Sequence, residues 1–260
     1  MRLFAMASLF SVLAWSGFVD AQGPVKVDSP ILLDLPESGT DTDKIDYAKL
    51  PVVKGTHAVI CPKDPDWKFQ LHNYLLFHEG KFWCMWSHGP AEDEVTQHIR
   101  YAVSDDGVKW SAPKMLTPAP KEGYAYIARG FWLRDGELLA LVAHFKGRGA
   151  FGVNKELKLE AYVWNQKAGA WKFKGPVYDN AINSYPPQKL PSGEWMVSRR
   201  DARFNVSVLI GGVKGFDQWE NVFIMDFFKN KVLKPDEPIW WSVDDKTISA
   251  VFRDNAGSQR

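Results

Sequence analysis

The chain has 260 residues, of which 45% are hydrophobic, so it is long and apolar enough to bury a large core, and nothing in its composition is typical of a disordered or fibrous protein. Its 32 Lys and Arg residues nearly balance 31 Asp and Glu residues, and no basic run is present, which argues against a nucleic-acid partner. Two cysteines are too few for a disulfide framework.

Residues 1–21 predict a secretory signal peptide. Met1-Arg2 precedes the apolar stretch Leu3–Val19, and short residues follow at the expected cleavage site, ending at Ala21. We therefore expect a secreted or periplasmic protein with no membrane contact after cleavage. An uncleaved membrane anchor is the alternative, because the apolar run approaches the length that spans a bilayer.

Residues 22–50 are rich in Pro, Asp, Ser and Thr and predict an N-terminal arm without an assigned function. Residues 51–260 form the predicted folded body. Cys61 and Cys84 lie in this body, where they either form one bridge, if their strands are neighbours, or remain buried thiols.

A unit of two strands joined by a glycine turn, a third strand and a turn ending in Trp recurs along the body. The expected strands are 71–77, 81–87 and 98–103 before Trp110; 127–133, 137–143 and 159–164 before Trp171; 185–190, 194–198 and 206–210 before Trp219; and 239–243 with 247–252 in a fourth, partial unit.

This recurrence predicts an all-β β-propeller. The turn glycines Gly80, Gly136 and Gly193 are 56 and 57 residues apart, a period typical of propeller blades. About four blades are visible, one of them partial, with a possible outer strand at 57–61, so we expect a chain truncated at its C-terminus. A small four-bladed ring and a β-sandwich are the alternatives.

The ends of the second strands are the expected ligand-binding face. His88, His144, Arg200 and Arg253 each lie seven or eight residues after a hairpin turn, which predicts that they share one height. Guanidinium and imidazole groups that converge at one mouth suit a carboxylate or sulfate, although exposed strand ends are often polar without a ligand. The neighbouring candidates are Arg199, Asp201, Arg203, Asp254 and Asn255.

The starts of the first strands add side chains suited to sugar rings, although a histidine in such a strand is more often a satisfied core residue. These candidates are His72, Asn73, Tyr124, Tyr126 and Arg129, with Asn183 and Tyr185 nearby. For chemistry we select Asp93 as a general acid from the loop Glu92–Glu94, with His88 and Tyr124 as further catalytic candidates. An acidic loop is also commonly just solvated.

Spacing of the His and Cys residues predicts no metal site, and no phosphate-binding loop or other cofactor motif is present. A glycan or oligosaccharide is therefore the expected partner, bound without a cofactor.

The segment Ser104-Asp105-Asp106-Gly107-Val108-Lys109-Trp110 resembles the Asp-box motif of the sialidase superfamily. In that motif Ser104, Asp106, Gly107 and Trp110 have structural roles. The resemblance implies a six-bladed propeller acting on terminal acidic sugars, with arginines holding the carboxylate, an Asp acid and base, and a Tyr nucleophile activated by Glu. The Arg-Ile-Pro motif that carries the first of these arginines is absent, and the Tyr and Glu would lie in later blades.

Three functional hypotheses follow. The first is an exported sialidase-like glycoside hydrolase acting on acidic or modified terminal sugars. The second is a propeller-type polysaccharide lyase on uronate glycans, in which a histidine among His72, His88 and His144 works with a tyrosine such as Tyr124. The third is a glycan-binding propeller without catalysis, which would leave its ligand unaltered.

Overall fold

The computed structural model describes residues 46–50, 52, 54–230, 234–244 and 247–255. The chain divides into two units, 1–55 and 56–260. In the first unit the described element is the single-turn helix η2 (Tyr47–Lys49), which begins after Asp46, whose carboxylate accepts a hydrogen bond of 3.1 Å from the Ala48 amide. The predicted signal peptide and most of the predicted arm lie outside the described residues.

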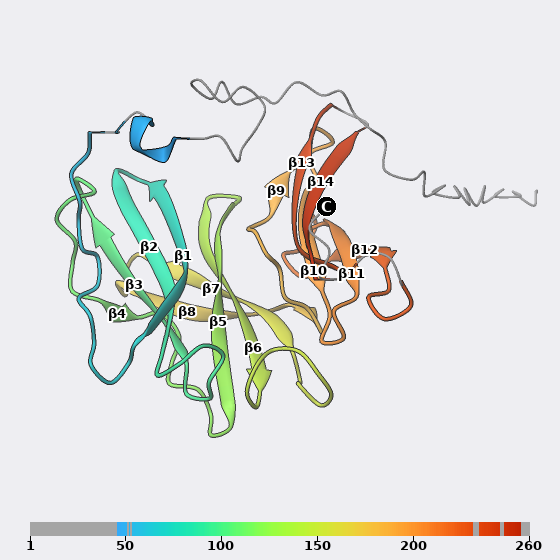
Figure 1. The fold of residues 1–260 in the computed structure, drawn as a ribbon, viewed down its shortest axis with the longest axis horizontal. Coiled ribbons are helices and arrows are strands. Elements are labelled where there is room, and N and C mark those ends of the chain that lie inside the picture. The colour runs from blue at the N-terminus through green and yellow to red at the C-terminus, as the bar shows by residue number, and fades with distance from the viewer. Residues whose placement is uncertain (1–45, 51, 53, 231–233, 245–246, 256–260) are drawn as a thin grey trace, which may run out of the picture. The chain divides into compact units, whose positions relative to one another are not determined.

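The second unit is built of antiparallel strands arranged in four sheets, which follow one another in chain order (Figure 1). Sheet A contains β1 (Phe69–His78), β2 (Lys81–Gly89), β3 (His98–Ser104) and β4 (Lys114–Met115). Sheet B contains β5 (Tyr124–Arg134), β6 (Glu137–Lys146), β7 (Lys158–Asn165) and β8 (Ala170–Asp179). Sheet C contains β9 (Gln188–Lys189), β10 (Trp195–Arg200), β11 (Val206–Gly211) and β12 (Trp219–Met225), and sheet D contains β13 (Pro235–Ser242) and β14 (Ile248–Asp254).

Two-residue turns form the predicted hairpins of sheets A and B. In Glu79-Gly80 and Asp135-Gly136 both residues have positive φ, between 49° and 79°, which matches the turn type that follows the twist of paired strands. The first strand of sheet C is shorter than predicted, at two residues, because Pro186, Pro187 and Pro191 surround it and provide no amide donors. The possible outer strand at 57–61 is wrong, since these residues form no strand.

The turn before Trp110 is held together by its own side chains. The Ser104 hydroxyl accepts a hydrogen bond of 2.9 Å from the Gly107 amide, and Asp106 Oδ1 accepts bonds from the amides of Val108 and Lys109. The Trp110 indole donates to the Gly107 carbonyl at 3.0 Å, so the ring folds back over the turn. Trp219 repeats this bond with the carbonyl of Phe216, three residues earlier, at 2.9 Å.

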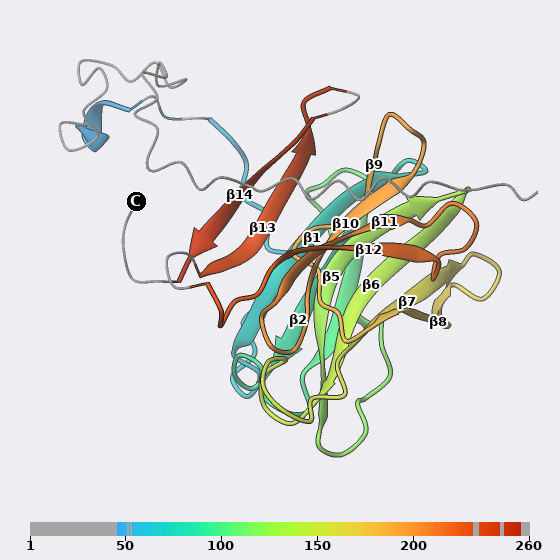
Figure 2. The ribbon, with the colours of Figure 1, turned by 90° about the vertical axis from the view of Figure 1, so that its right-hand side faces the viewer.

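Neighbouring sheets pack through continuous apolar cores. Trp83 and Met85 of sheet A share a buried cluster with Phe131 and Tyr162 of sheet B. A second cluster joins the opposite face of sheet B to sheet C, with the Trp132 ring 5.4 Å from that of Trp195. Three four-stranded sheets that pack in succession, followed by the two-stranded sheet D, are the blades of a β-propeller and not the two layers of a sandwich (Figure 2).

The inner strands of sheets A and B lie close to the segment that leads into β9. Gly130 has φ +103°, and a Cβ at this position would lie 2.3 Å from Pro186 Cγ and 3.2 Å from the Tyr74 ring. Bulges in β1, between Leu71 and Tyr74, and in β5, between Ala128 and Phe131, accompany this close approach. Within the described part of the chain, no helix is long and apolar enough to cross a membrane.

Candidate functional site

The loops between second and third strands of sheets A, B and C lie next to one another at one end of the sheets. The Gly149 amide donates to the Asp93 carbonyl at 2.9 Å, and the Gly152 amide donates to the Ala202 carbonyl at 2.7 Å. The rings of Phe151 and Phe204 stack with centroids 4.0 Å apart. Three blades therefore contribute loops to one continuous surface.

Charged and polar side chains of these blades, some buried and some half-buried, form a group that we call the central cluster. Its members come from all three blades and interact electrostatically with one another. The central cluster comprises His72, Tyr74, Asp93, Arg129 and Arg200. Four of these five residues are sequence-predicted candidates, and Tyr74 is the addition.

Arg129 is the least compensated charge of the central cluster. Its side chain is 7% exposed and lies beside the Tyr74 hydroxyl, which donates to the Ser184 carbonyl at 3.0 Å. Its Nε has no hydrogen-bond partner among the described residues. Burial, reinforced by the positive charge of Arg200, lowers the pKa of Arg129. A buried guanidinium of this kind is a ready donor fork for an anion.

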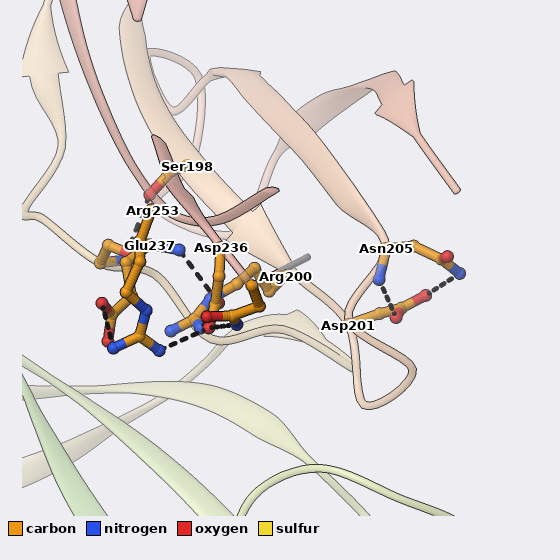
Figure 3. A network of polar contacts seen from close by, with 9 residues as sticks. Ser198, Arg200, Asp201, Asn205, Asp236, Glu237 and Arg253 are labelled. Carbon is orange, nitrogen blue, oxygen red and sulfur yellow. Dashed lines mark hydrogen bonds and ion pairs between the residues drawn. The ribbon is translucent and has the colours of Figure 1, made fainter. Parts of the chain in front are cut away.

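Arg200 and Arg253 are engaged by one carboxylate (Figure 3). Asp236, which is 4% exposed, accepts a short hydrogen bond from Arg200 Nη1 and a bond of 2.8 Å from Arg253 Nη2. Asn255 Nδ2 donates to the same carboxylate at 2.9 Å. Although burial opposes ionisation, Arg200 and these donors hold the pKa of Asp236 below its ordinary value. The two predicted clamps thus form an internal ion-pair network that joins sheets C and D.

The environment of Asp93 favours the neutral form of its carboxyl group more than water does. It lies in the β2–β3 loop with φ 54°, and its Oδ1 is buried without a hydrogen-bond partner among the described residues. Burial and the neighbouring Glu92 raise its pKa, which Arg129 and Arg148 offset in part. A shift in this direction is the one expected of a carboxyl group that acts as a general acid.

Asp201 has a different role, because its carboxylate is used within its own turn. Oδ1 accepts bonds from the amides of Arg203 and Asn205, and Oδ2 accepts one from Asn205 Nδ2 at 3.0 Å (Figure 3). The neighbouring Arg199 donates to the Asn180 carbonyl at 2.9 Å and lies over the Tyr178 ring. Both side chains thus have structural contacts outside the central cluster.

A second group, the His144 cluster, lies on sheet B and its β6–β7 loop. His144 Nδ1 is 3.0 Å from Glu160 Oε1, and Nε2 is buried without a partner among the described residues. The ring of His144 lies 4.6 Å from Tyr126 and 5.2 Å from Tyr124, measured between centroids. The Tyr124 hydroxyl donates to Glu156 Oε2 at 2.7 Å, and this bond raises the tyrosine pKa.

His88 is fully buried and does not reach either cluster. It stacks on Trp67 with centroids 5.4 Å apart and contacts the edge of His98, while its Nε2 is 3.9 Å from Asp64 Oδ2. Burial, together with Arg100, lowers its pKa to about 4, so the ring is neutral near pH 7. The four residues expected at one mouth therefore lie in three separate places. His88 and His144 each lie apart, whereas Arg200 and Arg253 share Asp236 as a partner.

Two further candidates also lie apart from the central cluster. Asn73 lines a small cavity on the other side of sheet A, together with both cysteines. Asp254 Oδ1 accepts a hydrogen bond of 2.9 Å from the Lys234 amide, beside the network of Asp236. Within the described residues, no group of three or more His, Cys, Asp or Glu side chains is arranged to hold a metal ion.

Sequence reasoning missed Tyr74, Glu156, Glu160 and Asp236. Asp236 lies at the start of β13, and in the other units the starts of the first strands were searched for candidates. The predicted strand of this unit began at position 239, three residues after Asp236, so Asp236 was not considered. Applying the same rule to the observed start of β13 finds it. Glu160 and Tyr74 carried no comparable signal, since their positions follow from strand pairing and from the bulge in β1.

Comparisons with known proteins identify the fold but assign no family. No protein-family profile matches the chain, and no curated protein sequence does. A family 117 glycoside hydrolase of the marine bacterium Zobellia galactanivorans superposes with a TM-score of 0.51 at 12% identity, over 74% of this chain and 64% of that one. A β-fructofuranosidase of Schwanniomyces occidentalis gives 0.48 at 8% identity, and a sialidase of Trypanosoma rangeli gives 0.44 at 12%.

The shared lengths are partial. The β-fructofuranosidase match covers 64% of this chain and 35% of that protein, and the sialidase match covers 58% of this chain and 30% of that protein. The chain thus spans about a third of the length of these two structures. At such low identity the likeness establishes a fold found in propeller-type glycoside hydrolases.

Proposed function

We propose that the chain belongs to an exported, propeller-type glycoside hydrolase that acts on acidic terminal sugars, in the manner of a sialidase. The observation that carries the proposal is Arg129, a buried cation with an unpartnered Nε in the innermost strands of the blades. A carboxylate on a sugar would supply the missing negative charge through two parallel hydrogen bonds. The reaction class is supported by the likeness to the family 117 glycoside hydrolase, which superposes with a TM-score of 0.51.

Asp93 is the proposed general acid. The raised direction of its pKa supports a role as proton donor to the oxygen of the departing sugar, and its charge interaction with Arg129 supports a position near the carboxylate that Arg129 would hold. His72 is the proposed neutral neighbour. Burial and the two arginines lower its pKa to about 3, and its Nδ1 lies 3.1 Å from the Ser87 hydroxyl, so it adds no further positive charge.

The reaction is tested by incubating the protein with glycans that end in sialic acid, in a uronate, or in the matching neutral sugar. We expect release of acidic sugars alone, and we expect Asp93→Asn to retain binding while losing release, because an amide cannot donate the proton. Absence of release from every glycan would exclude the hydrolase, and saturable binding without release would favour a glycan-binding propeller.

A polysaccharide lyase acting on uronates is the second candidate, and the His144 cluster favours it. Glu160 orients His144 so that its other nitrogen is left unpartnered among the described residues, and Tyr124 lies within 5.2 Å between ring centroids, an arrangement suited to proton transfer. His72 and His88 are poorer bases for this reaction, since their pKa values are about 3 and about 4. A lyase forms an unsaturated, ultraviolet-absorbing uronate, and Tyr124→Phe would abolish it, whereas the hydrolase reaction at the central cluster would continue.

A further inference from the structure

The two cysteines of the chain lie on the same face of sheet A, the face turned away from sheet B. Cys84 of β2 belongs to a buried apolar cluster with Trp86 and Ala102, and Cys61 packs against that cluster. Alternate residues of β2, namely Met85 and Trp83, belong instead to the core shared with sheet B. Both cysteines also line one cavity of about 290 Å³.

The segment 56–68, which precedes β1, lies across this face of sheet A. Besides Cys61, it contributes Trp67, which stacks on His88, and Asp64, which approaches the same ring. Gln70 Nε2 donates to the Pro62 carbonyl at 3.3 Å, next to Cys61 in the chain. These contacts, which follow Cys61 closely in the chain, hold the segment on the face of sheet A that carries Cys84.

We propose that Cys61 and Cys84 are a disulfide-forming pair that fastens the segment 56–68 to sheet A. Both are thiols in the structure, both line the cavity between the segment and the sheet, and they are near enough for Cys61 to act electrostatically on Cys84. Cys61 is half-buried and Cys84 is buried, so an external oxidant reaches Cys61 first. The bond would close a loop between positions 61 and 84 and so restrict the unfolded chain.

The oxidation proceeds by exchange with a small-molecule disulfide, such as oxidised glutathione. The Cys61 thiolate attacks one sulfur of the oxidant, forms a mixed disulfide and releases one reduced glutathione. The Cys84 thiolate then attacks Cys61 Sγ and releases the second, so that two protein thiols lose two protons and two electrons, which the oxidant gains. Burial raises the pKa of Cys84 to about 12, which makes this second step slow and faster at higher pH.

The test uses the full chain, purified with reductant and then incubated with oxidised glutathione. Thiols are counted after unfolding in guanidinium, and unreduced peptides are weighed by mass spectrometry. We expect the thiol count to fall from two to zero, with a peptide pair joined through Cys61 and Cys84 that is two hydrogen atoms lighter than its parts. We also expect the unfolding midpoint to rise by roughly 5–10 °C.

The Cys84→Ser variant is the matched control, because it removes the resolving thiol and should accumulate the glutathione adduct on Cys61. Two remaining thiols in the wild type, a persistent adduct on wild-type Cys61, or disulfides between two chains would each overturn the proposal. The thiol count and peptide masses of the wild type are enough to test the disulfide, so the test remains valid even if the Cys84→Ser variant does not fold.

Discussion

The guanidinium of Arg200 and the carboxylate of Asp236 form an ion pair in which the side chains are 5% and 4% exposed. Arg200 ends β10 and Asp236 begins β13, so the pair joins sheets C and D at the edge of the central cluster. Arg200 also lies over the Phe151 ring, with its guanidinium carbon 4.9 Å from the ring centroid. The pair therefore fixes both the position of a charged side chain near the proposed site and the attachment of the last described sheet.

Replacing Asp236 by Asn should strongly destabilise the fold. The variant leaves the Arg200 charge buried without its carboxylate, a change that costs about 3–5 kcal/mol in comparable buried pairs. The free energy of unfolding in urea measures the effect. Asp105→Asn is the control, because Asp105 pairs with Lys81 at the surface and should change the free energy of unfolding by about 0.5 kcal/mol or less. Equal effects of the two variants would contradict a supporting role for the buried pair.

Replacing Arg129 by Gln should weaken the proposed reaction without greatly altering the fold. Loss of a charge-assisted contact to the sugar carboxylate corresponds to a fall in kcat/KM of about 10- to 150-fold on acidic glycans. Arg203→Gln is the control, since Arg203 is exposed and its carboxylate neighbour Asp201 bonds to its backbone amide. Kinetics on acidic and neutral glycans provide the measurement. An unchanged ratio between the two substrate types would remove Arg129 from recognition of the carboxylate.

The stability of the fold should depend on the protonation of His88. Its pKa is about 4 in the folded chain and near 6.5 in the unfolded chain, so the unfolded state binds the proton more tightly between these pH values. Stability contributed by neutral His88 is therefore complete above about pH 6.5 and is lost at about 1.4 kcal/mol per pH unit as the pH falls towards 4.

The measurement for His88 is the slope of the unfolding free energy against pH, for the wild type and for His88→Gln. We expect a shallower slope in the variant, with the remaining slope due in part to His72, whose pKa is also lowered. His57→Gln is the control because His57 is exposed. Parallel slopes in wild type and His88→Gln would show that His88 does not control the acid sensitivity.

Replacing Gly130 by Ala should disrupt the contact between the inner strands. The new Cβ would lie 2.3 Å from Pro186 Cγ at a backbone φ of +103°, which combines a steric clash with backbone strain. We expect a loss of about 3 kcal/mol or more in unfolding free energy. Gly136→Ala is the control, because Gly136 also has positive φ but has open space around its Cβ position, so about 1 kcal/mol should be lost.

The hairpins of sheets A and B could be predicted from sequence because glycine turns and alternating strands act locally. The central cluster could be predicted only in part. Counting residues from a turn gives the height of a side chain along the sheet but not its face. Thus Ser87 points towards sheet B, where its hydroxyl accepts a bond of 2.9 Å from the Ala128 amide, whereas the next residue, His88, lies on the opposite face.

The approach of Arg129 to Tyr74 depends on bulges in two different strands, and no single-strand pattern predicts a bulge. The ion pair of Arg200 and Asp236 joins positions 36 residues apart. It could be predicted only if the position of sheet D beside sheet C were known. Four members of the central cluster could thus be selected from sequence, while Tyr74 and the pairing of Arg200 with Asp236 depended on tertiary structure.

The tight contact between Gly130 and Pro186 has a consequence for the evolution of this chain. A side chain at position 130 clashes with the proline ring at 186 unless that ring has first been removed or displaced, so a change at 186 must precede a change at 130. Among homologous sequences these two positions should therefore vary together, and a lineage that has lost the glycine should also have lost the proline.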